Sequence, residues 1–140
     1  MAVKIRKAIN TDIEQIINLL SQISPYKPQK KNYNKIWSNL KKQKQHYCIV
    51  AHQKNLMLGY GSIFIETKIR GGKVGHIEDI VTHPKYQKKG IGKKILQKLF
   101  NIAKKEKCFK MMLQCQPKNL KFYKKCNYKK SGIAMQRFIK

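Results

Sequence analysis

Acidic residues are scarce in this chain. Only 6 Asp and Glu stand against 32 Lys and Arg among 140 residues, so the formal net charge is +26 at pH 7. A surface this positive attracts polyanions through counterion release. However, nearly all of the excess is lysine spread along the chain, and no basic stripe with interleaved aromatics, zinc finger or RNA-recognition motif is visible. We therefore attribute the lysines to drift in an AT-rich genome rather than to nucleic-acid binding, with attraction of anionic substrates as a by-product.

Long apolar runs, paired cysteines and metal-ligand spacings are also missing. No stretch approaches the ~20 apolar residues of a membrane span, and the first residues do not resemble a signal peptide, so we expect a soluble, cytoplasmic protein. The four cysteines form no C-x-x-C pair, which favours buried free thiols over disulfides or a metal site. The four histidines lack ligand spacing, so no metal is expected. The length predicts one domain, 1–140.

Hydrophobic periodicity divides the chain into strands and helices. Alternating and β-branched runs predict strands, whereas apolar residues spaced three and four apart predict helices. The expected order is βααβββαβαβ, ending in one or two strands, which makes a mixed α+β domain. The expected elements cover residues 3–8, 12–23, 31–42, 46–52, 57–66, 76–82, 90–105, 109–115, 117–126 and 128–139.

Capping and turn residues set several of these boundaries. Thr11 and Glu14 form a capping box at the start of the first helix. The two prolines within residues 24–28 end that helix, because proline blocks its continuation. The polar dipeptide at 54–55 separates two strand-like runs and predicts a hairpin.

Three further residues predict unusual backbone. Gly59 and Gly61 interrupt a strand, which suggests a bulge or a close approach of another segment. Asn127 follows the last helix and can take the left-handed conformation that ends it.

The most informative stretch is GHIEDIVTHPKYQKKGIGK, Gly75 to Lys93. It reads as a strand, a turn at His83-Pro84, a glycine-bearing loop and a helix. Free N–H groups at a helix N-terminus bind phosphate, and glycines allow close approach, so a pyrophosphate is the expected ligand. Many turns with two glycines bind nothing, and that alternative stays open on spacing alone. The missing G-x-x-x-x-G-K-[ST] and third glycine argue against a nucleotide-triphosphate hydrolase and a Rossmann oxidoreductase.

The pattern Gln87-x-x-Gly90-x-Gly92, at a helix start after a His-Pro turn, resembles the acetyl-CoA pyrophosphate loop of the GNAT superfamily of N-acetyltransferases. Residues 75–80 and 119–126 closely resemble the glucosamine 6-phosphate N-acetyltransferases within it. The resemblance runs from Lys4 to the C-terminus. It implies a splayed, mostly antiparallel sheet flanked by helices, and acetyl transfer from acetyl-CoA to glucosamine 6-phosphate by direct attack in a ternary complex. It also implies a homodimer.

Glu78 and Asp79 are the most informative acids. Two adjacent carboxylates in an apolar strand are unusual in a chain with only six, since buried carboxylates need partners. Neighbours in a regular strand face opposite sides, so both could meet one ligand only at a bulge or through backbone groups. The resemblance places both at the aminosugar, where they orient the amine or help to deprotonate it.

The resemblance also implies the acetyl-CoA contacts. The strand after the acidic pair holds the thioester through its backbone, the loop holds the pyrophosphate, and Tyr123 donates to the departing thiolate. Core packing alone would also explain an aromatic at 123. The implied cofactor-binding residues are Ile80, Val81, Thr82, Lys88, Lys89, Gly90, Ile91, Gly92, Lys93, Gln114, Asn119 and Tyr123.

Substrate contacts are implied from several segments, and two of them depart from the family pattern. Gln114 stands where some relatives carry an acid, so any base at that position is absent or replaced by the acidic pair. Arg137 matches a phosphate-binding arginine but is one position out of register. Phe109 and Lys110 match a pair that reaches the substrate across a dimer interface. The implied substrate-binding residues are Ser24, Lys68, Ile69, Arg70, Gly71, Glu78, Asp79, Ile80, Phe109, Lys110 and Arg137.

Two alternatives remain. An acetyltransferase of the same fold could act on a polyamine, an antibiotic or a protein N-terminus, although six carboxylates hardly provide an acid-lined pocket for a polycation. A catalytically inactive, lysine-rich module that binds nucleic acid is the alternative from a different class, and the intact acidic pair, glycine loop and Tyr123 argue against it.

Overall fold

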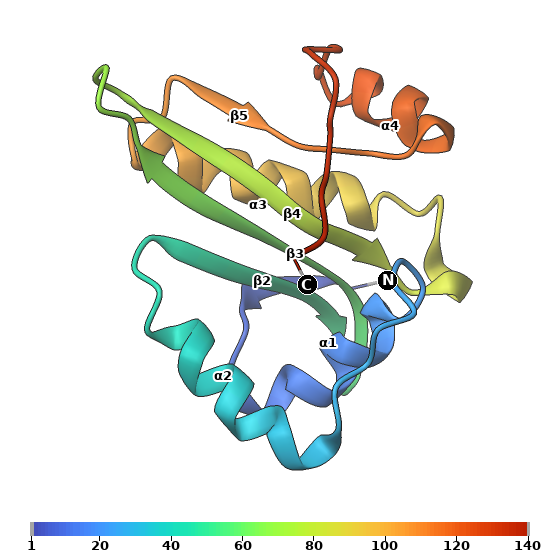
Figure 1. The fold of residues 1–140 in the computed structure, drawn as a ribbon. Helices are drawn as coiled ribbons and strands as arrows, with labels where there is room; N and C mark the ends of the chain where they lie inside the picture. The colour runs from blue at the N-terminus through green and yellow to red at the C-terminus, as the bar shows by residue number, and fades with distance from the viewer. Residues whose placement is uncertain (1, 140) are drawn as a thin grey trace.

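The fold is built on a five-stranded sheet whose strands lie side by side in chain order (Figure 1). The computed structural model describes residues 2–139. The first four strands pair antiparallel, and the fifth pairs parallel to the fourth. This arrangement confirms the expected mixed α+β fold with a mostly antiparallel sheet. The strands are β1 Lys4–Lys7, β2 His46–Gln53, β3 Leu56–Thr67, β4 Lys73–Thr82 and β5 Lys110–Met112.

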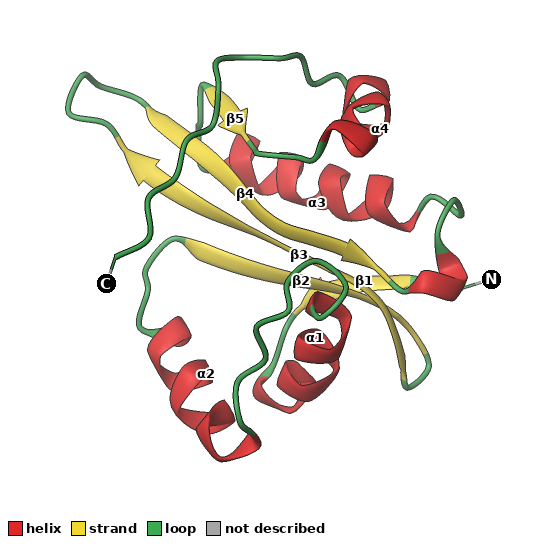
Figure 2. Cartoon of the chain, turned by 45° about the vertical axis from the view of Figure 1, so that its right-hand side comes forward, coloured by secondary structure: helices red, strands yellow, loops and turns green. Residues whose placement is uncertain are grey.

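Within the described residues, four α-helices accompany the sheet (Figure 2). α1 and α2 lie on one face and α3 on the other, so the sheet has a hydrophobic cluster on each side. None of these helices is long and apolar enough to cross a membrane. The helices are α1 Ile13–Leu20, α2 Tyr33–Lys41, α3 Ile91–Lys105 and α4 Leu120–Lys125.

The predicted apolar stripe of α3 forms the centre of the larger cluster. Ile91, Ile95 and Leu99 lie one turn apart and are almost fully buried against the sheet. Each such side chain contributes about 1.5–3 kcal/mol on burial. The sheet makes room for them with glycine, because a methyl group on Gly59 would lie 2.8 Å from Ile95 Cδ1 and one on Gly61 would lie 2.8 Å from Ile95 Cγ2. The predicted close approach at these glycines is confirmed.

The start and end of α1 differ from the prediction. The Thr11–Glu14 capping box is wrong: Asp12 Oδ2 accepts the Ile9 N–H at 2.8 Å, and Glu14 pairs instead with Lys30. The Asp12 carboxylate, which Arg6 also binds, is charged and is therefore a stronger hydrogen-bond acceptor than the Thr11 hydroxyl. The helix ends at Leu20 rather than continuing to residue 23, because the next turn has no core to pack against.

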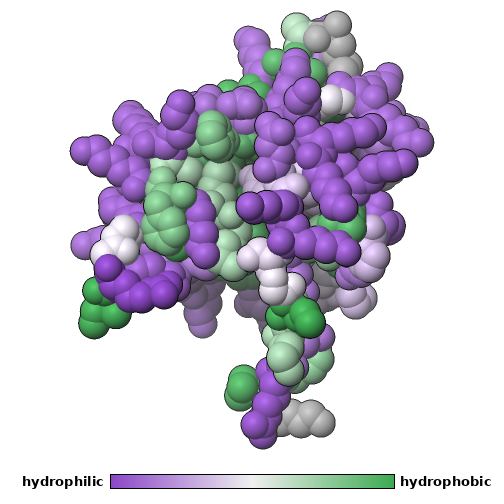
Figure 3. Space-filling view, turned by 90° about the horizontal axis from the view of Figure 1, so that it is seen from above, coloured by the Kyte–Doolittle hydropathy of each residue, from purple (hydrophilic) through white to green (hydrophobic). Residues whose placement is uncertain are grey.

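The C-terminal segment also differs from the prediction. The expected strand over 109–115 shortens to Lys110–Met112, and residues 128–139 form no strand. A strand needs a neighbouring edge, and this segment crosses in front of the sheet without pairing (Figure 2). It projects from the body of the molecule in Figure 3. Its apolar side chains are exposed, namely Ile133, Met135, Phe138 and Ile139.

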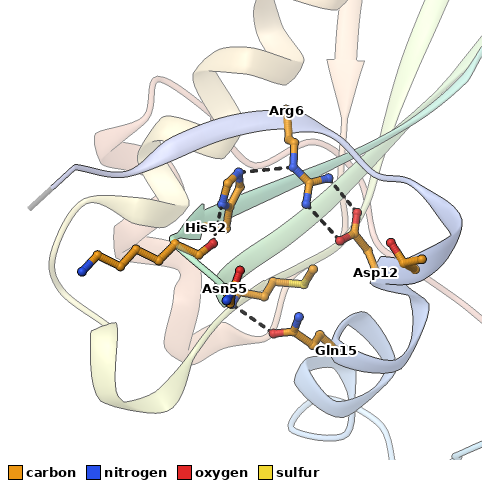
Figure 4. Close-up of a pocket in the computed structure, with 8 residues that line it drawn as sticks. Arg6, Asp12, Gln15, His52 and Asn55 are labelled. Carbon is orange, nitrogen blue, oxygen red and sulfur yellow. Dashed lines mark hydrogen bonds and ion pairs between the residues drawn. The ribbon is translucent and has the colours of Figure 1, made fainter.

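A polar network ties β1 to the β2–β3 hairpin (Figure 4). The Arg6 guanidinium donates to both oxygens of Asp12, at 2.7 and 3.0 Å, and its Nε donates to His52 Nε2 at 3.2 Å. Gln15 accepts the Met57 N–H at 3.1 Å. These side chains line a hollow of about 290 Å³. Because its principal polar groups bond to one another, we assign the hollow a structural role.

The ion pair also sets the charge of Asp12. Burial opposes ionisation, but hydrogen bonds from Arg6 and the Ile9 N–H outweigh it, so the pKa of Asp12 lies below its ordinary value. The Asp12 side chain is only 7% exposed. A group with a lowered pKa stabilises the fold above its unfolded pKa of about 3.9, and that stabilisation is lost as pH falls through the native value.

Asp12→Asn should therefore destabilise the protein by about 2–3 kcal/mol at pH 7. Urea unfolding between pH 7 and pH 2.5 checks this, and the gap to the wild type should close as the pH falls below about 4. Glu14→Gln is the matched control, because it removes a solvent-exposed ion pair and should change stability much less. A gap that stays constant with pH would contradict the role given to the Asp12 charge.

Candidate active site

The loop between β4 and α3 is shaped by two left-handed residues, Lys88 with φ 64° and Gly90 with φ 81°. The Gly90 carbonyl accepts the first helical hydrogen bond, from the Lys94 N–H at 3.0 Å. A methyl group at Gly90 would meet no atom within 4 Å, so this side of the loop is open. Helix geometry leaves the N–H groups of the first turn of α3 without helical acceptors. With the helix dipole they form a suitable site for phosphate.

Cationic side chains surround this helix start. Lys88, Lys89 and Lys93 are exposed, and the first turn of α3 contains no acid. The Lys89 ammonium lies 5.6 Å from the centre of the Tyr86 ring, which holds it near the loop. The loop therefore offers both backbone donors and positive charge to an anion.

Gly92 brings three elements together. A methyl group there would lie 3.1 Å from Phe122 Cζ on α4 and 3.6 Å from Thr82 Oγ1 at the end of β4. The end of β4, the start of α3 and the aromatic pair of α4 are therefore neighbours. This proximity joins the segments that the sequence predicts for thioester, pyrophosphate and thiolate.

Tyr123 lies on α4 and is 8% exposed. Its ring packs edge-on against Phe122 and Tyr128, with centroids 5.0 and 5.9 Å apart. Burial, with smaller effects from Cys115, Tyr128 and Cys126, raises the pKa of Tyr123 to about 12. Its hydroxyl therefore keeps its proton at neutral pH and can act as a hydrogen-bond donor.

β4 carries a bulge at the acidic pair. The β3–β4 register shifts between Tyr60 and Ser62, so Gly61 stands opposite both Asp79 and Ile80. Asp79 has φ 57°, a left-handed conformation that costs a residue with a side chain about 1–2 kcal/mol. The bulge breaks the alternation of the strand, and Glu78 and Asp79 are both exposed. This is the irregularity that the sequence argument requires if both are to meet one ligand.

The acidic pair also differs from the other carboxylates in its charge environment. Among residues 2–139, neither Glu78 nor Asp79 forms an ion pair, whereas the other four carboxylates all do. Burial, with a smaller effect from Asp79, raises the pKa of Glu78, while His76 acts in the opposite direction. The paired carboxylates are Asp12 with Arg6, Glu14 with Lys30, Glu66 with Lys68 and His76, and Glu106 with Lys73.

An opening in the sheet lies next to the bulge. β5 pairs with β4 only at Val74, Gly75 and His76, and the chain then diverges from β4 (Figures 1 and 2). Residues 78–82 therefore border the opening, with backbone groups that no strand of the described chain pairs on that side. The predicted splay of the sheet is confirmed. A linear ligand entering it would reach the acidic pair from the helix start of α3.

A second group of predicted site residues lies at the other end of β4. Residues 69–71 are exposed and Lys68 is half-buried. Phe109 lies beside this turn, since a methyl group on Gly72 would be 2.9 Å from Phe109 Cδ1. Lys110 follows on β5. Lys73 and Glu78 are five residue steps apart along β4, roughly 17 Å between their Cα atoms. The backbone of this group therefore lies away from the acidic pair, and the Lys68 ammonium turns back along the strand to Glu66 at 3.1 Å. The group comprises Lys68, Ile69, Arg70, Gly71, Phe109 and Lys110.

The remaining predicted residues are exposed. Ser24 lies in the α1–α2 connection, where its hydroxyl accepts the Tyr26 N–H at 3.2 Å. Gln114 lies just after β5, Asn119 precedes α4, and Arg137 lies in the C-terminal segment. Asn127, with φ 71°, ends α4 in the expected left-handed conformation. The described residues contain no group of three or more His, Cys, Asp or Glu arranged for a metal ion.

Two buried residues of β3 near the bulge, Tyr60 and Ser62, were missed in the sequence. Ser62 donates to the Glu78 carbonyl at 3.2 Å, and the Tyr60 hydroxyl donates to Cys48 Sγ at 3.3 Å. Their only sequence signal is the presence of hydroxyls in an apolar strand. The β3–β4 pairing register places these residues next to the bulge, and that register cannot be predicted from the sequence.

Chemically, the site combines four features around one opening. It offers an anion-binding helix start, unpaired strand backbone, a protonated phenol and two carboxylates without cationic partners. Such a set suits a reaction between a phosphate-bearing acyl donor and an amine.

Comparison with known proteins agrees with this set of features. The model of the acetyltransferase (GNAT) family matches residues 13–128. Glucosamine 6-phosphate N-acetyltransferase 1 of Dictyostelium discoideum is 34% identical over 125 residues, covering 86% of this chain and 80% of that protein. The Candida albicans enzyme of the same name is 36% identical over 101 residues, covering 71% of this chain and 67% of the other.

The structural comparison extends over the whole chain. The crystal structure of glucosamine-6-phosphate N-acetyltransferase from Arabidopsis thaliana has a TM-score of 0.91 and 28% identity, and the match covers 100% of both chains. With the family model matching most of its length, the chain belongs to the acetyltransferase (GNAT) family.

Proposed function

We propose that residues 1–140 form one N-acetyltransferase domain that moves the acetyl group of acetyl-CoA to the amine of D-glucosamine 6-phosphate. The products are CoA and N-acetyl-D-glucosamine 6-phosphate, a step toward UDP-N-acetylglucosamine. The observation that carries the proposal is the position of the unpaired Glu78–Asp79 bulge beside the β4–β5 opening, next to the start of α3. Relatives named for this reaction share 34% and 36% identity with the chain.

Different residues around the opening bind different parts of acetyl-CoA. The first turn of α3 and residues Lys88 to Lys93 bind the pyrophosphate through backbone donors and lysine charge. The backbone of Ile80 to Thr82 holds the pantetheine and thioester, and an N–H there stabilises the oxyanion that forms during attack. Gln114 and Asn119 line the cofactor path from the far side of the opening.

Tyr123 acts on the departing thiolate as a hydrogen-bond donor. Its pKa is raised to about 12, whereas an ordinary thiol has a pKa of about 8.5. Complete proton transfer from the phenol to the thiolate is therefore unfavourable. A hydrogen bond from the phenol still stabilises the negative charge as the C–S bond breaks.

The acidic pair acts on the amine. Attack needs an uncharged amine, so a group must orient the ammonium and accept its proton. Glu78 and Asp79 carry no ion pair that would compete for it, and the raised pKa of Glu78 makes that carboxylate the stronger base. The Gln114 amide can orient a hydrogen-bonded group but cannot accept the ammonium proton at neutral pH. We therefore assign the role of general base to Glu78 and Asp79.

The substrate phosphate is bound by the second group of residues, contributed by another copy of the chain. Arg70 and Lys110 lie at the other end of β4 from the acidic pair of their own chain, and Lys68 is held by Glu66, so we propose a homodimer in which these residues approach the partner's site. Exposed apolar residues in the C-terminal segment support such an assembly. Ser24 and Arg137 complete the phosphate contacts.

We also propose a cytoplasmic location and a reaction without metal. The four cysteines are free thiols, which suits a reducing compartment. The chemistry assigned above is complete with backbone donors, one phenol and two carboxylates.

Thiol release from acetyl-CoA tests the proposed function directly. The purified protein should release CoA with glucosamine 6-phosphate and far more slowly with glucosamine, spermidine or a lysine peptide. Activity with another amine alone would keep the fold and the donor but overturn the substrate. No CoA release with any of the four amines, together with salt-dependent DNA binding, would favour a nucleic-acid-binding module without acetyltransferase activity.

Tyr123→Phe should lower kcat about 100-fold and leave the acetyl-CoA KM nearly unchanged, because the lost hydrogen bond forms only as the thiolate develops. Steady-state kinetics with both substrates varied checks this. Tyr128→Phe is the matched control, since it removes a neighbouring, half-buried phenol whose ring packs edge-on against Tyr123. An unchanged kcat would remove Tyr123 from the reaction.

Replacing Ile133, Met135 and Phe138 with serine should convert a dimer into a monomer, because these exposed apolar side chains are proposed to pack on the partner. Light scattering after size exclusion measures the mass against the 16.5 kDa of one chain. The control changes the polar positions Ser131 and Gln136 to alanine and should stay dimeric. A wild-type protein that is monomeric at micromolar concentration would contradict the assembly.

A further inference from the structure

Ser62 is a buried polar residue in the middle of β3, directly under the bulge of β4. It is 2% exposed, and its neighbours Gly61 and Ile63 belong to the packed layer against α3. A hydroxyl at such a position needs a hydrogen-bond partner. Its partner is the carbonyl oxygen of Glu78, at 3.2 Å.

That carbonyl has a special place in the chain. It belongs to the peptide that joins Glu78 to Asp79, the residue held at φ 57°. On one side of this peptide the β3–β4 pairing keeps one register, and on the other side it resumes one residue out of step. The hydroxyl of Ser62 therefore holds the peptide plane at the point where the strand changes direction.

Two neighbours in β3 flank the serine. Tyr60 is 6% exposed, and its hydroxyl donates to Cys48 Sγ at 3.3 Å, so this buried polar group is also bonded. Gly61 leaves no room for a side chain, since Ile80 Cδ1 would lie 2.6 Å from its methyl group. The bulge is thus held by close packing of Ile80 against Gly61 and by the hydrogen bond from Ser62.

We propose that Ser62 is a positioning residue for acetyl transfer. Its hydroxyl orients the Glu78–Asp79 peptide, and through it the two carboxylates and the Ile80 backbone that border the opening. The left-handed Asp79 is strained, and without the hydrogen bond the strand relaxes toward regular pairing. Relaxation turns one of the two acids away from the ligand, because side chains alternate in a regular strand. The inference rests on the proposed function only where it concerns turnover.

Ser62→Ala tests the proposal by kinetics. We expect kcat to fall about 10- to 100-fold, as for a small displacement of reacting groups, with the acetyl-CoA KM unchanged. Ser62→Thr, which keeps the hydroxyl, should recover most of this loss. Ile65→Val is the matched control, because it removes one methylene from the same buried strand without touching the bulge, and it should leave kcat unchanged.

Amide hydrogen exchange tests the same proposal without turnover. In Ser62→Ala the N–H groups of Asp79 and Ile80 should exchange at least tenfold faster, relative to amides at the paired start of β4, than in the wild type. Ile65→Val should change both regions equally. Unchanged relative exchange at Asp79 and Ile80 overturns the proposal, and so does a kcat loss that Ile65→Val reproduces at equal thermal stability.

The two proposals fail in different ways. If the wild-type protein does not turn over glucosamine 6-phosphate, the proposed function is wrong, and hydrogen exchange still decides whether Ser62 holds the bulge. If the wild type is active and Ser62→Ala keeps full kcat with unchanged exchange, only the role of Ser62 is wrong.

Discussion

The divergence of β4 from β5 is the constraint on which the site depends. After three paired positions the strands separate, and residues 78–82 keep unpaired backbone groups on one side. Unpaired backbone in a sheet is costly unless water or a ligand satisfies it. The fold retains this edge and closes its far end with the start of α3 and the aromatic pair of α4. An elongated ligand can thus take the place of the missing strand, with its phosphates at the helix start.

Charge then determines the orientation of a substrate that carries both signs. Four of six carboxylates form ion pairs, so in the described chain only the bulge offers negative charge without a cation bound to it. The net charge of +26 attracts a phosphate to the surface in general. An ammonium group is favoured only near Glu78 and Asp79. The scarcity of acid, which first suggested polyanion binding, therefore makes the one acidic position more selective.

Local signals predicted most of the fold, and pairing between distant segments limited the rest. The stripe of α3 and the hairpin around 54–55 depend on neighbouring residues, and both are confirmed. Glu78 and Asp79 were identified by their rarity, whereas Ser62 acquires its role only through the register with β4. The capping box at Thr11 failed because Arg6, from β1, makes Asp12 the better acceptor. The strand expected over 128–139 failed because this segment pairs with no strand edge among residues 2–139.

The positions of the cationic residues along β4 determine how the substrate phosphate can be bound. The turn 68–71 and Lys110 stand at one end of β4, and the acidic pair stands toward the other. Lys68 already forms an ion pair with Glu66, so even this cation is partly neutralised in its own chain. A site assembled from one chain would hold the amine and leave the phosphate to the general field of the lysines. We therefore propose that a second chain contributes the specific phosphate contacts, and the exposed apolar side chains of the C-terminal segment are the candidate interface.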